Sequence, residues 1–87
     1  MMNVKKTERI AYILKDITEY GKFVAYCIDH DISVYRLYWN EQNKNCCYVI
    51  YSDMKLAGVA NKDMCAVAYQ LKEPKFYLSK YGRWLIK

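Results

Sequence analysis

Residues 46–51, Cys46-Cys47-Tyr48-Val49-Ile50-Tyr51, form the stretch that decides the class of fold. Aromatic and β-branched residues dominate this run, which is typical of a β-strand. A second run rich in β-formers occupies residues 34–39, and the polar residues 40–45 separate the two. This pattern predicts a β-hairpin with a long loop. Residues 54–60 predict a third strand, reached through a turn at residues 52–53.

Helical spacing of apolar residues comes before these strands. Thr7 is a suitable N-cap, Glu8 favours a first helical turn, and Gly21 is a plausible end. The spacing predicts a first helix whose apolar face holds Ile10, Ile13, Leu14 and Ile17. The stripe continues over residues 22–30 through Val24, Cys27 and Ile28. It predicts either a second helix, which we prefer, or one longer helix with Gly21 inside at a cost of about 1 kcal/mol.

A further helix and a second hairpin follow the central strands. Asn61 is a suitable N-cap, and Pro74 ends the helix because it drives its predecessor out of the α region. Between them, helical spacing relates Met64, Val67, Ala68 and Leu71. Residues 76–78 and 83–86 flank a turn and predict the second hairpin.

These elements predict an α+β fold in a single small domain of residues 1–87. We expect an antiparallel sheet of four to five strands, with two hairpins, packed on one face against two to three helices. The chain has 87 residues, of which 54% are apolar and 26% charged, so it forms one small core and is not a disordered tail. Domains of this size gain stability from a partner, which leaves room for a homodimer.

Composition also indicates the compartment. No apolar run approaches the length of a membrane span, and the start of the chain lacks the apolar stretch of a secretory signal. We therefore expect a cytoplasmic protein that does not engage a membrane. In that reducing compartment the cysteines are expected to be free thiols; they are Cys27, Cys46, Cys47 and Cys65.

Catalytic and metal sites find little support in the sequence. His30 is the only histidine, and Asp29 and Asp31 flank it, which is also the composition of a polar turn after a helix. No nucleophile stands beside it, and no CxxC spacing points to zinc. Phosphate-binding glycine motifs and nucleophile-elbow motifs are missing from the sequence. We expect no enzyme activity, no cofactor and no metal.

The last thirteen residues combine lysine, arginine and tyrosine in a chain of net charge +5. Strand alternation places basic and aromatic side chains together on the outer face of the second hairpin. Lysine and arginine neutralise phosphates and tyrosine rings stack on bases, so we expect RNA or single-stranded DNA to bind there. The opposing interpretation is that the lysines protect an edge hairpin from aggregation. The candidate residues are Lys75, Tyr77, Lys80, Tyr81, Arg83 and Lys87, supported by Lys5, Lys6 and Arg9.

The alternative function is protein binding by a tyrosine-rich sheet face or an exposed edge strand. Its candidate residues in the first predicted hairpin are Tyr35, Arg36, Tyr38 and Trp39. A compact chain that is rich in Lys, Asn, Ile and Tyr and lacks enzymatic motifs resembles small accessory proteins of bacteriophages and mobile elements. The resemblance implies a partner that is nucleic acid or a nucleic-acid-handling host protein, or an inhibited target such as a nuclease, a defence complex or a toxin.

Overall fold

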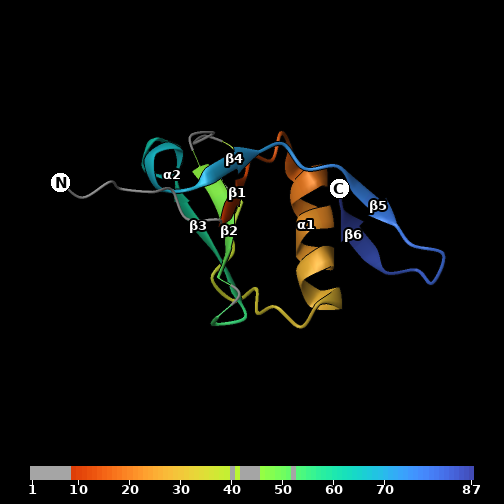
Figure 1. Ribbon diagram of the computed structural model, residues 1–87. Helices are drawn as coiled ribbons and strands as arrows, with labels where there is room; N and C mark the ends of the chain where they lie inside the picture. Colours follow the sequence, from red (N-terminus) through yellow and green to blue (C-terminus); the bar gives the residue numbers. More distant parts are fainter. Residues whose placement is uncertain (1–8, 40, 42–45, 52) are drawn as a thin grey trace.

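The computed structural model describes residues 9–39, 41, 46–51 and 53–87 (Figure 1). Within these ranges the chain forms an α+β fold with a four-stranded sheet of order β3-β2-β1-β4 and a separate two-stranded hairpin. In chain order the elements are β1 (Ile10–Tyr12), α1 (Ile17–Asp29), β2 (Cys46–Tyr51), β3 (Leu56–Asn61), α2 (Lys62–Ala68), β4 (Gln70–Lys72), β5 (Phe76–Leu78) and β6 (Trp84–Ile86).

The four-stranded sheet is mixed, which corrects the prediction of a wholly antiparallel sheet. β2 is antiparallel to both β1 and β3, whereas β4 is parallel to β1. The parallel pair arises because α2 carries the chain from β3, at one edge, across the sheet to β4, at the other edge. A crossover of this kind returns the chain in the same direction, whereas a tight turn reverses it.

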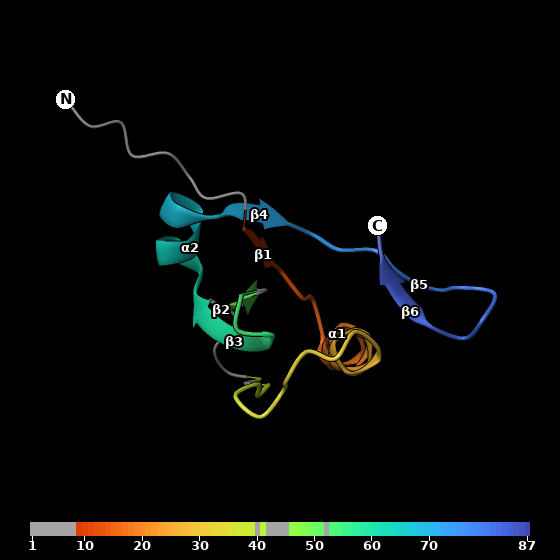
Figure 2. The same cartoon turned by 60° about the horizontal axis from the view of Figure 1, so that its bottom comes forward.

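Helix α1 forms the middle of a layered arrangement, with the sheet on one side and the β5–β6 hairpin on the other (Figure 2). Helix α2 packs on the opposite face of the sheet. The alternation of β2 shows this directly, because Tyr48 packs with α1 residues while Cys47 and Val49 pack with Cys65 of α2. The expectation that all helices cover one face was therefore wrong, and the same holds for the expectation that the second hairpin belongs to the main sheet.

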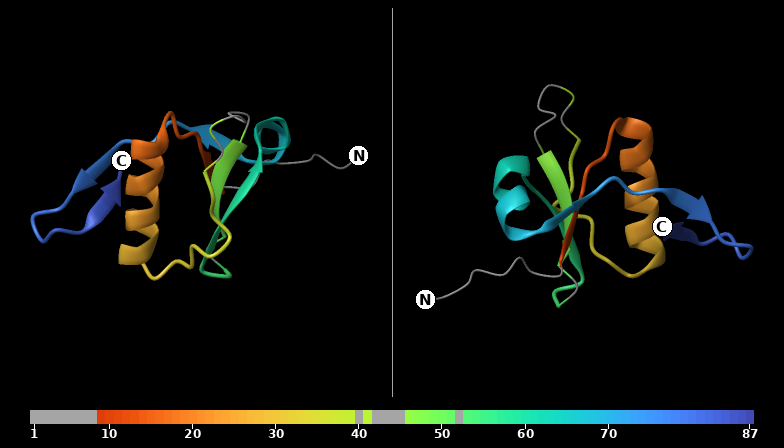
Figure 3. Two further views of the ribbon diagram at one scale, coloured as in Figure 1. Left: turned by 180° about the vertical axis from the view of Figure 1, so that it is seen from behind. Right: turned by 45° about the horizontal axis from the view of Figure 1, so that its top comes forward.

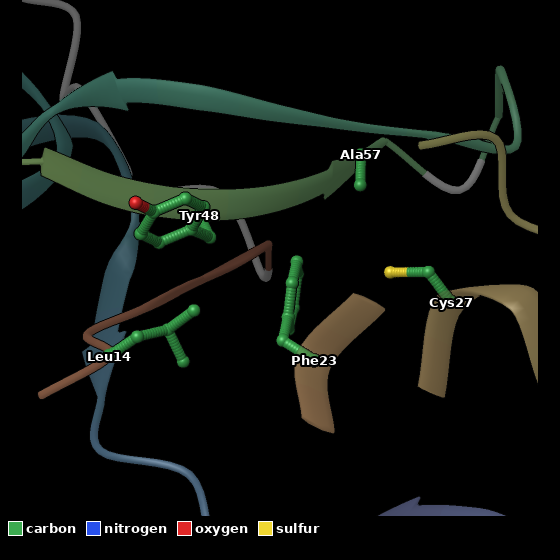
Figure 4. Packing of buried hydrophobic residues seen from close by; sticks show 5 residues of the cluster. All are labelled: Leu14, Phe23, Cys27, Tyr48 and Ala57. Carbon is green, nitrogen blue, oxygen red and sulfur yellow. The ribbon is translucent and has the colours of Figure 1, made fainter. Parts of the chain in front are cut away.

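The larger core cluster lies between α1 and the sheet. Its buried members are Leu14, Phe23, Cys27, Tyr48 and Ala57 (Figure 4). Phe23 is fully buried, and its ring lies 5.7 Å from that of Tyr12 and 5.9 Å from that of Tyr48, measured between ring centroids. Its ring also lies 6.4 Å from that of Phe76 in the hairpin. One side chain of α1 thus packs against both of the other layers.

The first predicted helix is wrong at its start. Residues 10–12 form β1, and α1 begins at Ile17 after the N-cap Asp16, whose carboxylate accepts a hydrogen bond of 2.9 Å from the Glu19 amide. The Glu19 carboxylate in turn accepts one of 2.7 Å from the Lys15 amide. This reciprocal cap fixes the helix start. Thr7, the predicted N-cap, lies outside the described residues. Gly21 lies inside α1, so the preferred prediction of two helices is wrong, and the alternative of one helix that contains Gly21 is confirmed over residues 17–29.

The predicted strand over residues 34–39 is absent, and this segment is irregular in the structure. Asp31 adopts a φ of 57°, which turns the chain after α1. Among the described residues between α1 and β2, Ser33 alone pairs with the sheet, through an isolated bridge to Leu56. The observed hairpin of the sheet joins β2 to β3, where residues 46–51 and 54–60 were both expected to be strands.

Helix α2 begins at the predicted N-cap, because the Asn61 side chain accepts a hydrogen bond of 2.8 Å from the Asp63 amide. It ends earlier than predicted, at Ala68, and Leu71 belongs to β4. Cys65 anchors α2 to the sheet, while Met64 and Val67 are exposed. Of the helices within the described ranges, none combines the length and the apolar character needed to cross a membrane.

Candidate nucleic-acid interface

The β5–β6 hairpin lies where the sequence predicts it. It projects from the side of α1 that faces away from the four-stranded sheet (Figure 1). Tyr77 pairs with Leu85 between two other pairs, Phe76 with Ile86 and Leu78 with Trp84. The ladder continues at both ends through the bonds Lys87 N–H to Lys75 C=O and Ser79 N–H to Arg83 C=O, each 2.8 Å long. Strand alternation therefore places residues 75, 77, 83, 85 and 87 on one face of the hairpin.

The turn of the hairpin is shaped by Ser79 and Gly82. The Ser79 hydroxyl accepts hydrogen bonds from the amides of Tyr81, at 3.3 Å, and Arg83, at 3.1 Å. The Gly82 amide donates to the Ser79 carbonyl at 2.9 Å, and Gly82 has a φ of 78°, where a side chain would be strained. This turn holds Lys80 and Tyr81 at the outermost tip.

The outer face and the tip are basic and aromatic. Tyr81 is 84% exposed and Tyr77 is 45% exposed. The Lys80 ammonium lies 5.1 Å from the centre of the Tyr81 ring, a cation–π contact that keeps charge and ring together. The remaining cations of this surface are also exposed; they are Lys75, Arg83 and Lys87. We call this set of six residues the hairpin patch: Lys75, Tyr77, Lys80, Tyr81, Arg83 and Lys87.

The inner face attaches the hairpin to the rest of the molecule. Phe76 and Ile86 pack against the core cluster, and the Lys22 ammonium of α1 lies 5.9 Å from the centre of the Trp84 ring. Leu78 is exposed near the tip, so the inner face is covered only in part. The hairpin is thus docked at its base while its tip extends into solvent.

The C-terminal end of α1 binds the edge of β6. The Asp29 carboxylate accepts a hydrogen bond of 2.8 Å from the Trp84 amide, and Nε2 of His30 lies 3.0 Å from the Trp84 carbonyl oxygen. A carbonyl only accepts, so Nε2 carries the proton. Nδ1 of His30 is then free to accept from the Arg83 guanidinium at 3.3 Å. Together these side chains satisfy the outward backbone groups of Trp84 and orient one cation of the hairpin patch.

The bond from Trp84 to Asp29 provides a direct prediction about hairpin docking. Replacing Asp29→Ala removes a charge-assisted acceptor, which we expect to cost about 1.5–3 kcal/mol. The Trp84 amide should then exchange with deuterium faster than in the parent, as measured by NMR. Asp29→Asn keeps an acceptor oxygen and should lose less. Equal exchange rates in Asp29→Ala and the parent would contradict this account.

The N-terminal residues expected to support this surface do not join it within the described chain. Lys5 and Lys6 lie outside the described residues. Arg9 makes a 3.2 Å ion pair with Asp53, and its guanidinium lies 4.7 Å from the centre of the Tyr51 ring. Arg9 directly precedes β1. The sheet that contains β1 and the hairpin lie on opposite sides of α1 (Figure 2). Its charge is engaged locally, so the hairpin patch stands without it.

The residues expected to bind a protein divide into two groups. Tyr35, Arg36 and Tyr38 are exposed, and the Arg36 guanidinium lies 5.5 Å from the centre of the Tyr35 ring. Trp39 instead turns inward. Its ring stacks at 6.3 Å on Tyr48 of β2, and its Nε1 donates a hydrogen bond of 2.8 Å to Glu41. Trp39 therefore anchors the segment, while the other three residues present a surface.

Sequence reasoning missed the residues that position the hairpin. In the sequence, His30 and Asp29 were weighed as a catalytic group and matched the composition of a polar turn after a helix, and no pattern singled out Lys22. Their partners are in β6, more than fifty positions further along the chain. No local pattern in the sequence could have paired them.

Comparisons with protein-family models, with curated proteins and with solved structures find no match for this chain.

Proposed function

We propose that this protein binds single-stranded nucleic acid, RNA or DNA, through the hairpin patch, without catalysing a reaction. The supporting observation is that its four cations and two exposed tyrosines occupy the outer face and tip of a projecting hairpin. The sequence has no acidic residue between 75 and 87, so nothing within the hairpin neutralises those cations.

The geometry favours a single strand over a duplex. A stacking platform needs an accessible aromatic ring, and the bases of a duplex already stack on one another. Tyr81 offers such a ring at the tip, with the Lys80 ammonium beside it for a phosphate. Tyr77 offers a second ring on the outer face, in line with Lys75. Alternating rings and charges suit the alternating bases and phosphates of an unpaired strand.

The test is a fluorescence anisotropy titration of labelled oligouridylate and oligothymidylate at increasing salt. The double variant Lys80→Glu with Arg83→Glu should bind at least about tenfold more weakly. Its plot of log affinity against log salt should be shallower by about 1.4, since two phosphate contacts are lost. Tyr81→Ala should weaken binding by about 1–3 kcal/mol, while Tyr81→Phe, which keeps the ring, should not.

A matched control separates a local contact from a general effect of net charge. Lys55→Glu with Lys62→Glu makes the same change in charge on the turn before β3 and on α2, away from the hairpin. This control should retain most of the affinity. Equal losses in the two double variants, or binding by the parent that is insensitive to salt, would show that the hairpin patch is not the binding site.

A further inference from the structure

Strand β3 forms one edge of the four-stranded sheet (Figure 3). Within the part of the chain that the structure describes, its outer side pairs only with Ser33, which donates to the Lys55 carbonyl at 2.8 Å and accepts from the Ala57 amide at 3.0 Å. The chain of residues 34–38 then leaves the strand, because Leu37 N–H closes a turn on Val34 C=O at 2.9 Å. The edge is therefore occupied at its beginning and open further along.

The open stretch presents backbone groups for pairing. In a strand the N–H and C=O of residues two apart point to the same side, so those of Val59 point outward like the Ala57 amide that bonds Ser33. The register agrees, because Gly58 pairs with Val49 on the inner side. Among the described residues, Val59 has no hydrogen-bonded backbone partner on this edge. A donor and an acceptor are thus available for an added strand.

A cavity of about 240 Å³ lies where the chain leaves this edge. Its described lining residues are Arg36 and Tyr38 of the irregular segment, Tyr51 of β2, Met54 of the turn, and Leu56, Gly58 and Val59 of β3. Pockets for drug-sized ligands measure roughly 300–1,000 Å³, so this one is suited to a side chain and not to a whole cofactor. A Cβ on Gly58 would lie 3.3 Å from the Tyr51 ring, and its absence lets that ring settle over the strand.

Residues 36–38, which border the cavity, are held in place by contacts with β2 and α1. The Tyr48 hydroxyl donates to the Tyr38 carbonyl at 3.3 Å, and the Trp39 ring packs on Tyr48 and, at 5.6 Å, on Tyr20. Burial raises the pKa of Tyr48 far above the neutral range, so its hydroxyl remains a donor. The cavity is thus largely formed before any ligand arrives, which lowers the cost of binding.

The charge of the cavity indicates what it would bind. Arg36 is the charged residue in the lining, and within the described chain its guanidinium makes no ion pair. The Arg36 guanidinium lies over the Tyr35 ring, a contact that leaves its N–H donors free for a carboxylate. An acidic side chain entering the cavity would meet this cation beside the apolar surface of Leu56 and Val59.

We infer that the open edge of β3 and this cavity form a docking site for an extended, acidic segment of a protein partner. The segment adds a strand beside β3, exchanging hydrogen bonds with the N–H and C=O of Val59, and places an acidic side chain against Arg36. Backbone pairing supplies affinity in this mode of recognition, and the pocket supplies selectivity. This site lies on the sheet, on the other side of α1 from the hairpin patch, so the protein would have two separate binding surfaces.

The test is a selection of short random peptides displayed on phage, followed by anisotropy titration of labelled copies of the enriched peptides. Enriched sequences should carry an acidic residue among β-forming neighbours. Arg36→Glu should weaken their binding at least about tenfold, since an ion pair becomes a repulsion. Arg36→Lys keeps the charge without the fork of donors and should lose less.

Two substitutions at Val59 test the backbone pairing. Val59→Pro removes the outward N–H, and an edge strand tolerates proline where that group faces solvent. It should therefore abolish peptide binding while the protein stays folded by circular dichroism. Val59→Thr keeps the N–H and should bind like the parent. If Val59→Pro is misfolded, NMR of the parent protein decides the same question. The Val59 amide signal should shift when the peptide is added, and an unchanged signal would contradict backbone pairing.

Three outcomes would overturn the inference. The first is that the enriched peptides lack an acidic residue and bind Arg36→Glu as well as the parent. Oligouridylate could displace them, which would make Arg36 part of the nucleic-acid surface. A concentration-dependent dimer, detected by sedimentation and lost in Val59→Pro, would show that a second copy of this chain occupies the edge.

Discussion

Phe23→Ala is expected to remove about 3–5 kcal/mol from the free energy of unfolding, measured by urea denaturation. The ring of Phe23 is fully buried and lies close to rings in the sheet and in the hairpin. Truncation would leave a cavity where all three layers meet. Small domains have only about 5–15 kcal/mol of stability in total, so this one change should bring the protein close to unfolding.

The control for Phe23 is on the same helix. Ile28 is 60% exposed, and Ile28→Ala should change stability by no more than about 0.5 kcal/mol. If Phe23→Ala is too unstable to purify, Phe23→Leu tests the same contact with a smaller cavity. A loss below about 1 kcal/mol in Phe23→Ala would mean that α1 does not hold the layers together. Weaker nucleic-acid binding should accompany the loss, since Phe76 would lose its contact.

Alkaline pH is expected to destabilise the protein strongly. Burial raises the pKa of the Cys27 thiol from 9.0 to about 12 and that of the Cys47 thiol to about 11. Both thiols are fully buried, so their raised pKa values contribute stability that is complete below pH 9. As the pH rises from 9 towards these folded-state values, the thiols of the unfolded chain lose their protons while those of the folded chain keep them, so the stability contribution is lost.

The magnitude follows from the pKa difference. Each unit corresponds to about 1.4 kcal/mol, so Cys27 alone accounts for about 4 kcal/mol between pH 9 and 12. Urea midpoints in the presence of a reductant should be nearly constant from pH 7 to about 8.5 and should then fall. Cys27→Ala is less stable at neutral pH, but its midpoint should fall less steeply above pH 9. Parallel curves for parent and variant would contradict this explanation.

Local sequence patterns identified the strands that pair with the next strand along the chain. β2 and β3 are joined by a short turn, β5 and β6 likewise, and all four were predicted within a residue or two. The N-cap Asn61 was also found, because a cap is a bond between near neighbours. The class of fold, α+β, follows from these elements together.

β1 was mistaken for a helix because both faces of this strand are covered. Ala11 packs on the α2 side and Tyr12 on the α1 side, so the strand is a continuous apolar run without alternation. Such a run cannot be told from a buried helix by its period. Asp16 and Glu19 offered a better signal for the start of α1, since their spacing is that of a reciprocal cap.

Residues 34–39 were mistaken for a strand because their composition suits one. The aromatic side chains of Tyr35, Tyr38 and Trp39 have high β-propensity, yet of the described residues only Ser33 pairs with the outer edge of β3. The Trp39 ring packs on Tyr48 of β2, and a turn closed by Leu37 N–H on Val34 C=O leads the chain away from the edge. That departure creates the cavity beside Arg36.

The sequence by itself determined the α+β class, the hairpin at the C-terminal end, and the alternation that gathers basic and aromatic side chains on its outer face. These depend on period and on neighbours along the chain. Only the tertiary structure decided that α1 separates this hairpin from the sheet, that Asp29 and His30 bind its edge, and that β3 remains open beside Arg36. Those features join residues far apart in sequence, and their geometry depends on which faces become buried together.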